Sequence, residues 1–165
     1  MITIRRYATG DEAQVKTLVT AIMNSEFHDS KAAYPTEDLE NISHTYGGLG
    51  EAFFVACDGD NIVGTVGIKK EDDRVALLRR LFVAQPYRHQ QIGLKLIDRA
   101  LQFCAEVGYD ELIFKTTSTM KRAIEICKKR GFVQRAKLNL GQLELMKFSL
   151  PVRNILAAKT KSHKD

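Results

Sequence analysis

The 165-residue chain lacks several features that mark specialised classes of protein. It contains no Trp, only 3 Pro and only 3 Cys. No apolar run approaches the roughly 18–20 residues that a membrane-spanning helix needs. Residues 1–7 alternate between apolar and polar side chains and lack the apolar stretch of a signal peptide. We therefore expect an ordinary globular protein in the cytoplasm, with no membrane partner.

The three cysteines, Cys57, Cys104 and Cys127, are widely spaced and odd in number. They form neither a CxxC metal pair nor a disulfide framework. Each lies within an apolar pattern, so we expect reduced, buried thiols. No metal is expected.

The net charge of +5 is unevenly distributed along the chain. Residues 151–165 contain four basic side chains against Asp165, whereas residues 1–150 contain 21 basic and 19 acidic ones. This distribution predicts a single domain over residues 1–150 followed by a basic C-terminal tail at 151–165. Nucleic-acid binding as the main function is disfavoured, because the domain itself is almost neutral.

Hydrophobic periodicity predicts an alternation of strands and helices. Strands are expected at 2–7, 52–57, 61–68, 75–83, 112–116, 132–138 and 143–150. Helices are expected to begin after Asp11 (with Gln14 completing a capping box), Thr36, Pro86 and Ser118 or Thr119, with Gly108 and Gly131 ending the last two. The order β-α-α-β-β-β-α-β-α-β-β predicts an α/β fold with a mixed, mainly antiparallel central sheet and helices on both faces. Only the strand-helix-strand unit across 77–116 requires a parallel pair.

The turn at residues 83–97, Val-Ala-Gln-Pro-Tyr-Arg-His-Gln-Gln-Ile-Gly-Leu-Lys-Leu-Ile, is the most informative segment. A helix entered directly from a strand presents free backbone N–H groups and a positive dipole end, which together bind anions. Gly93 removes a side chain that would stand between the backbone and a ligand, while Arg88 and Lys95 add positive charge. The segment is neither a Walker A loop nor a GxGxxG dinucleotide fingerprint, so ATP, GTP and NAD are disfavoured as its ligands.

Residues 81–97 resemble the acetyl-CoA signature of the GCN5-related N-acetyltransferase (GNAT) family. In that family, a strand is followed by [Gln/Arg]-x-x-Gly-x-[Gly/Ala]. Arg88 and Gly93 match the first and last positions, whereas Gln91 stands where the family usually has Gly. Ala123 with Gly131-Phe132 resembles a later family pattern, and the predicted element order matches the family fold over essentially the whole chain.

The resemblance implies a set of cofactor-binding residues. The backbone at 81–83 would pair with the pantetheine arm, and the N–H groups at 88–95 would hold the pyrophosphate. Gln91 can still donate its N–H, provided that its dihedral angles are ordinary. The set comprises Leu81, Phe82, Val83, Arg88, His89, Gln90, Gln91, Ile92, Gly93, Leu94 and Lys95.

The usual catalytic groups of the family are missing at the matching positions. Leu77 replaces a Glu that often serves as base, Cys127 replaces a Tyr that often serves as acid, and Met120 replaces an Asn. We therefore leave the catalytic residues unassigned. Cys127 is expected to be buried, and Glu51 is a lesser candidate for the base.

Residues 25–50 show the weakest pattern, and loops of this kind often carry residues that select the substrate. The polar and aromatic candidates there are Glu26, His28, Asp29 and Tyr34. Alternation along the strand at 75–83 sends Arg79 and Arg80 to opposite faces, so one of them should reach the cleft and bind an anionic substrate group or form a salt bridge. The substrate-side candidates are Glu26, His28 and Arg79.

Our first hypothesis is an N-acetyltransferase in which a primary amine directly attacks the thioester of acetyl-CoA. The acceptor, a small molecule or a peptide amine, is left open, as is a homodimer. The alternative is a non-catalytic module that binds or senses acyl-CoA. A third hypothesis, a nucleic-acid-binding domain with a basic tail, is disfavoured by the charge distribution.

Overall fold

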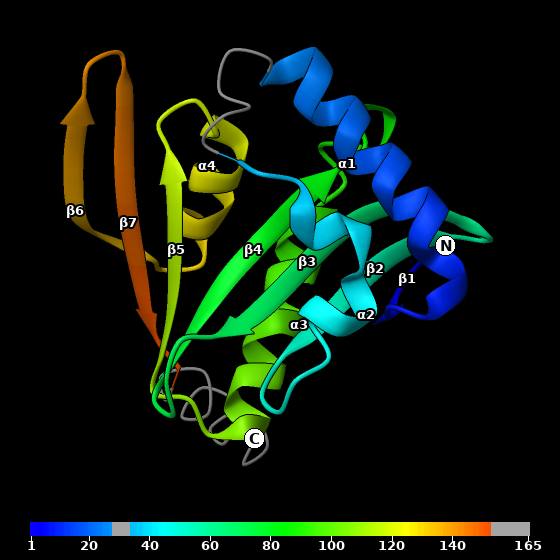
Figure 1. The fold of residues 1–165 in the computed structure, drawn as a ribbon, viewed down its shortest axis with the longest axis horizontal. Coiled ribbons are helices and arrows are strands. Elements are labelled where there is room, and N and C mark those ends of the chain that lie inside the picture. Colours follow the sequence, from blue (N-terminus) through cyan, green and yellow to red (C-terminus); the bar gives the residue numbers. More distant parts are fainter. Residues whose placement is uncertain (28–33, 153–165) are drawn as a thin grey trace.

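The computed structural model describes residues 1–27 and 34–152 and shows a seven-stranded sheet between helices (Figure 1). The strands are β1 (Ile2–Arg6), β2 (Ala52–Asp58), β3 (Asn61–Lys70), β4 (Val75–Val83), β5 (Glu111–Thr117), β6 (Val133–Leu140) and β7 (Leu143–Pro151). The helices are α1 (Glu12–Glu26), α2 (Ile42–Thr45), α3 (Ile92–Val107) and α4 (Lys121–Lys129), with 3-10 turns η1 (Thr9–Asp11), η3 (Glu37–Glu40) and η4 (Gln85–Tyr87). This order confirms the one predicted from the sequence.

The strands follow the order β1-β2-β3-β4-β5-β7-β6 across the sheet. All neighbouring pairs are antiparallel except β4 and β5, which are parallel and connected through α3. The prediction of a mixed, mainly antiparallel sheet is therefore confirmed.

Strands β4 and β5 stay together over only three residues. Val75–Leu77 pairs with Glu111–Ile113, and no further pair follows. Beyond this point the two strands splay apart, as Figure 1 shows. Their facing backbone edges are therefore left without a partner strand, which places polar backbone groups in the middle of the sheet.

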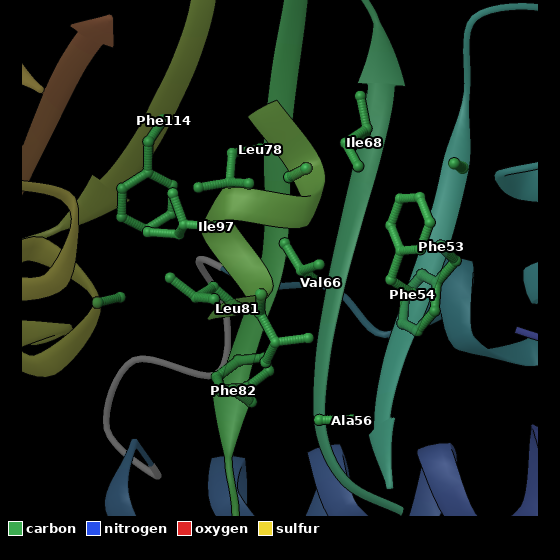
Figure 2. Close-up of a cluster of buried hydrophobic side chains, with 14 of the residues drawn as sticks. Phe53, Phe54, Ala56, Val66, Ile68, Leu78, Leu81, Phe82, Ile97 and Phe114 are labelled. Carbon is green, nitrogen blue, oxygen red and sulfur yellow. The ribbon is translucent and has the colours of Figure 1, made fainter. Parts of the chain in front are cut away.

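Helices cover both faces of the central strands. Helix α3 packs against β2, β3 and β4, while α1 packs against β3 and β4 from the opposite face (Figure 1). Figure 2 shows that the buried side chains come from β2, β3, β4, α3 and β5. Double coverage explains why almost every residue of β2 and β3 is buried, on both faces of each strand.

A bulge interrupts β4 just before the strand reaches the predicted cofactor turn. The register between β3 and β4 shifts between Thr65 and Gly67, which leaves Arg80 and Leu81 together opposite Val66. Arg80 adopts φ +54°, and the Thr65 hydroxyl donates to the Arg80 carbonyl at 2.7 Å. A bulge re-aims the side chains that follow it, and simple alternation along the sequence does not anticipate it.

Three predicted side-chain caps are wrong, whereas both predicted glycine stops are confirmed. Thr36 directly precedes η3, but its side chain forms no capping hydrogen bond. The carboxylate of Asp11 accepts hydrogen bonds from Arg5 and from the Ala8 N–H, so it does not cap α1. Gln14 accepts a hydrogen bond from the Ile62 N–H at 3.0 Å instead of completing a capping box. Helix α4 starts after Met120 without a side-chain cap. Gly108 and Gly131 take the left-handed conformation at φ +99° and +101°.

The described chain ends inside the fold. Pro151 is the last residue of β7, and Val152 is buried with its N–H donating to the Asp110 carbonyl at 2.8 Å. The packed region therefore includes the first two residues of the expected tail, and the remainder, 153–165, lies outside the described residues. Within 1–27 and 34–152, no helix is long and apolar enough to cross a membrane.

Candidate active site

The strand-to-helix turn presents fewer free N–H donors than the sequence predicts. The Arg88 N–H donates to the Gln85 carbonyl, and the Lys95 N–H donates to the Gln91 carbonyl. The expectation that residues 88–95 all offer free donors is therefore wrong at both ends. Among the described residues, the N–H groups between His89 and Leu94 have no backbone partner, and they lie at the positive end of α3.

Gln91 does not have the ordinary dihedral angles that the sequence-based argument required. Its φ is +64° and its ψ is +18°, and His89 is also left-handed at φ +67°. A residue with a Cβ is strained in this conformation. The turn thus keeps the backbone conformation that suits Gly at position 91, although the residue is Gln.

Gly93 allows the first turn of α3 to approach α4. A Cβ at this position would lie 2.6 Å from Cδ1 of Ile126. A two-pronged ion pair holds the same helices together, with Arg130 Nε and Nη2 lying 2.5 and 2.6 Å from the Asp98 carboxylate. The glycine therefore serves helix packing in addition to the close ligand approach expected of it.

The Arg88 guanidinium is already engaged within the protein. Nη1 and Nη2 donate to the Glu26 carboxylate at 2.7 and 2.6 Å, and Nε donates to the Val83 carbonyl at 3.1 Å. This clamp joins the last residue of α1 to the turn. The Glu26 carboxylate also neutralises the charge of Arg88. This side chain therefore adds less positive charge to the anion site than the sequence predicts.

A cavity of about 360 Å³, which we call the turn cavity, lies against the strand-to-helix turn. Nine of the eleven predicted cofactor residues line it, while Gln90 and Lys95 do not. Glu26, predicted on the substrate side, also lines this cavity. The lining residues are Ile22, Glu26, Phe27, Leu81, Phe82, Val83, Tyr87, Arg88, His89, Gln91, Ile92, Gly93, Leu94, Met120, Arg122, Ala123, Glu125, Ile126 and Lys129.

Two cationic residues of the turn cavity were not predicted. Arg122 and Lys129 lie on the face of α4 that also carries Ile126. Their spacing of seven residues, with Ile126 between them, marks one helical face. This spacing is the sequence signal for the two cations, and it lies beside the apolar stripe of Ala123, Ile124 and Cys127.

A second cavity of about 500 Å³, the splay cavity, is lined by β4, β5 and residues 34–38. It shares Leu81, Phe82, Met120 and Ala123 with the turn cavity. The two cavities therefore meet at the end of β4 and the start of α4. The splay cavity is lined by Tyr34, Pro35, Glu37, Asp38, Leu77, Leu78, Arg79, Arg80, Leu81, Phe82, Phe114, Lys115, Thr116, Met120 and Ala123.

An ion pair between Asp38 and Arg80 fixes one wall of the splay cavity. Arg80 Nη2 and Nε lie 2.6 and 2.9 Å from the carboxylate oxygens of Asp38, and the Tyr46 hydroxyl donates to Asp38 at 2.7 Å. Burial opposes ionisation of Asp38, but the hydrogen bonds and charge of Arg80 outweigh it and lower the pKa of that carboxyl. Arg80 thus satisfies the salt-bridge outcome that the sequence left open.

Arg79 lines the splay cavity and is exposed, although it sits in a central strand. Its side chain forms no hydrogen bond or ion pair within the part of the chain that the structure describes. Tyr34 also lines this cavity, and its hydroxyl accepts a hydrogen bond from the Thr117 N–H at 2.8 Å. His28 and Asp29 lie outside the described residues.

The two candidate proton carriers raised by the sequence do not reach either cavity. Cys127 is fully buried, and burial raises the pKa of its thiol to about 12. The expectation that it is a buried packing residue is confirmed. Glu51 lies 2.8 Å from Lys69 Nζ and lines neither cavity, so its position does not support a role as base.

Comparisons with known proteins agree with this geometry. A profile of the acetyltransferase (GNAT) family matches residues 18–132. A probable N-acetyltransferase, camello of Xenopus tropicalis, is 31% identical over 111 residues, covering 66% of this chain and 51% of the relative. Human N-acetyltransferase 8 is 32% identical over 101 residues, covering 58% of this chain and 44% of that protein. The chain thus spans about half the length of the curated relatives that it matches.

Solved structures share the fold over nearly the whole chain. A GNAT acetyltransferase of Staphylococcus aureus Mu50 superposes with a TM-score of 0.81 at 27% identity, covering 92% of this chain and 99% of that chain. A putative acetyltransferase of Salmonella typhimurium, solved with its cofactor acetyl-CoA, superposes with a TM-score of 0.76 at 17% identity, covering 92% and 94%. The matched profile spans well over half of the residues, and the chain belongs to the GNAT acetyltransferase family.

Proposed function

We propose that this protein is an N-acetyltransferase that transfers an acetyl group from acetyl-CoA to a primary amine. The observation that carries the proposal is the meeting of two cavities at the splayed end of β4. The turn cavity contains the N-terminus of α3, which can bind an anion. The splay cavity is lined in part by charged side chains of β4, β5 and residues 34–38. Two substrates held in adjacent cavities can react directly, and positioning alone supplies much of the rate.

The residues of the turn cavity fit acetyl-CoA, which supplies an acetyl group activated as a thioester. The free N–H groups between His89 and Leu94 would hold the pyrophosphate. Arg122 and Lys129 add charge for further phosphate oxygens. Ala84 donates its N–H to Val63 on β3, so alternation directs the N–H of Val83 toward the open edge, where it can bind an amide or carbonyl oxygen.

The acceptor amine must lose a proton before it attacks. Asp38 is engaged by Arg80 and Tyr46, and Glu37 is the other carboxylate that lines the splay cavity among the described residues. The Glu37 side chain forms no hydrogen bond or ion pair within residues 1–27 and 34–152. We assign it the role of accepting this proton, directly or through water.

Substitutions at Gly93 test the cofactor site. Gly93→Ala and Gly93→Glu both place a Cβ against Ile126, but only Gly93→Glu adds negative charge where the pyrophosphate is expected. We expect Gly93→Glu to weaken acetyl-CoA binding at least about tenfold more than Gly93→Ala does, measured by calorimetric titration. A carboxylate near a helix N-terminus favours the helix, so thermal unfolding should confirm that the variant is folded. Equal affinities of the two variants would overturn the assignment.

The alternative, a non-catalytic acyl-CoA-binding module, is favoured by one specific observation. Neither Leu77 nor the buried Cys127 offers the titratable group that the family often uses. Release of CoA thiol, followed with a broad panel of amines, separates the two functions. Tight binding of acetyl-CoA without amine-dependent release of thiol would identify the binding module.

Two further expectations from the sequence stay predictions. The edge strand β6 is exposed along its whole length and carries Val133, Leu138 and Leu140. An exposed apolar edge supports a homodimer formed through this strand, and the molar mass in solution, compared between the wild type and Leu138→Lys, would test it. A cytoplasmic location would be tested by fractionation of the source cells.

A further inference from the structure

We infer that the acceptor of the proposed acetyl transfer is an amino acid or a close analogue, with its carboxylate bound by Arg79 and Lys115. The inference rests on the proposed function and deepens it by naming the class of acceptor. It derives from the register of β4 and β5 and from the charges of the splay cavity.

The parallel register places the two cations at the same level. Leu77 pairs with Ile113 at the last contact before the strands splay. Two residues further along each strand come Arg79 and Lys115, which therefore project from the same face of the sheet as that pair. Both line the splay cavity and both are exposed in strands that are otherwise largely buried.

The charges of the splay cavity do not balance internally. Arg80 and Asp38 neutralise each other. Lys115 forms an ion pair with Glu71 at 3.3 Å, in which the two side chains are 57% and 38% exposed. The Arg79 side chain has neither a hydrogen bond nor an ion pair among the described residues. Arg79 therefore has no carboxylate partner among the described residues, and Lys115 has one only at the surface, so the two cations suit a carboxylate brought by the ligand.

Glu37 adds a negative charge to the lining of the splay cavity. A free amino acid carries an ammonium and a carboxylate on one carbon, and both signs of charge are present in the lining. The volume of about 500 Å³ is that of a small-molecule site. In the reaction the ammonium first gives one proton to Glu37, and the neutral amine nitrogen then bonds to the acetyl carbon. The nitrogen loses a second proton as the carbon–sulfur bond breaks, and the departing CoA thiolate gains one. The carboxylate is unchanged and serves only to position the amine.

Matched acceptors test the inference. Each set contains an amino acid, its carboxamide and the amine that lacks the carboxyl group, built on glycine, leucine and phenylalanine. The measured quantity is the ratio of kcat/KM for the acid to kcat/KM for the amide. We expect Arg79→Met to lower this ratio about tenfold or more and Arg79→Glu to lower it further. Comparing the ratio between variants cancels the different amine pKa values of acid and amide.

Arg135→Met serves as the matched control, because Arg135 is an exposed arginine in β6 that lines neither cavity. It should leave the ratio unchanged. Lys115→Met should lower the ratio by a smaller factor than Arg79→Met, since Glu71 already offsets part of the Lys115 charge. An acid-to-amide ratio that is the same in the wild type and in Arg79→Met overturns the inference while leaving acetyl transfer intact. Absence of turnover with every amine, despite binding of acetyl-CoA, overturns the proposed function itself.

Discussion

At the scale of single residues, the turn stores strain at Gln91. Its left-handed φ of +64° costs a residue with a Cβ about 1 kcal/mol, from which the greater freedom of Gly in the unfolded chain subtracts part. We expect Gln91→Gly to raise the free energy of unfolding by up to about 1 kcal/mol in urea titrations. Gln90→Gly is the control, because Gln90 is not among the described residues with positive φ, and it should be neutral or destabilising. An equal gain from both would show that the strain is absent.

The sequence reveals the residues of this turn better than it reveals their partners. Arg88 and Gly93 stand out because they match a short local pattern. The pairing of Arg88 with Glu26 spans 62 positions, and no local pattern encodes such a contact. Cys127 could be predicted as buried because its neighbours at helical spacing are apolar. The Arg80 side chain forms an ion pair with Asp38, whereas the Arg79 side chain has no partner among the described residues. This difference depends on the bulge in β4, which interrupts the regular alternation of side chains.

At the scale of elements, the Asp38–Arg80 pair attaches η3 to the bulge of β4. The side chains are only 14% and 8% exposed, so removing one partner leaves a poorly solvated charge. We expect Asp38→Ala to lower the free energy of unfolding by about 3 kcal/mol. Asp110→Ala removes the partner of Arg74 in a pair that is 58% and 82% exposed, and it should cost less than about 1 kcal/mol. Similar losses for the two variants would contradict a structural role for the buried pair.

The lowered pKa of Asp38 also fixes the pH range in which this contribution operates. A carboxyl whose pKa is depressed by folding stabilises the folded state above its ordinary pKa. The contribution is lost as the pH falls below that value toward the folded pKa. The difference in stability between the wild type and Asp38→Ala should therefore shrink in acid.

Strands and helices were predictable from the sequence because their hydrophobic periods are local properties. The ends of these elements were harder to predict. The sequence favours Asp11 as a helix cap, but its carboxylate accepts a hydrogen bond from Arg5, six residues earlier in the chain. The splay of β4 from β5 was also hidden, since both strands read as ordinary buried strands and only the short register shows where they part.

At the scale of the whole molecule, two buried thiols set a limit on stability in alkali. Burial raises the pKa of Cys104 and of Cys127 from 9.0 to about 12. Between these values the unfolded chain loses the protons first, so the stabilisation is complete below pH 9 and is lost as the pH rises toward 12. We expect the free energy of unfolding to fall less steeply over this range in the double variant Cys104→Ala, Cys127→Ala than in the wild type.

The comparison should use chemical unfolding at several pH values. The double variant will be less stable at neutral pH, because each substitution leaves a small void. Its slope against pH should nevertheless be shallower by up to about two protons per molecule. Parallel curves for the two proteins would contradict the assignment of the thiols to the alkaline transition.

The four side chains shared by the two cavities, Leu81, Phe82, Met120 and Ala123, have a consequence for inhibitor design. They are apolar, so the junction between the two cavities favours an uncharged bridge. A single compound in which CoA is joined through a short linker to an amino acid would occupy both cavities at once. Because its two halves would be tethered, the second would bind at a high effective concentration. The linker length that gives the tightest binding would therefore report the distance between the two bound substrates.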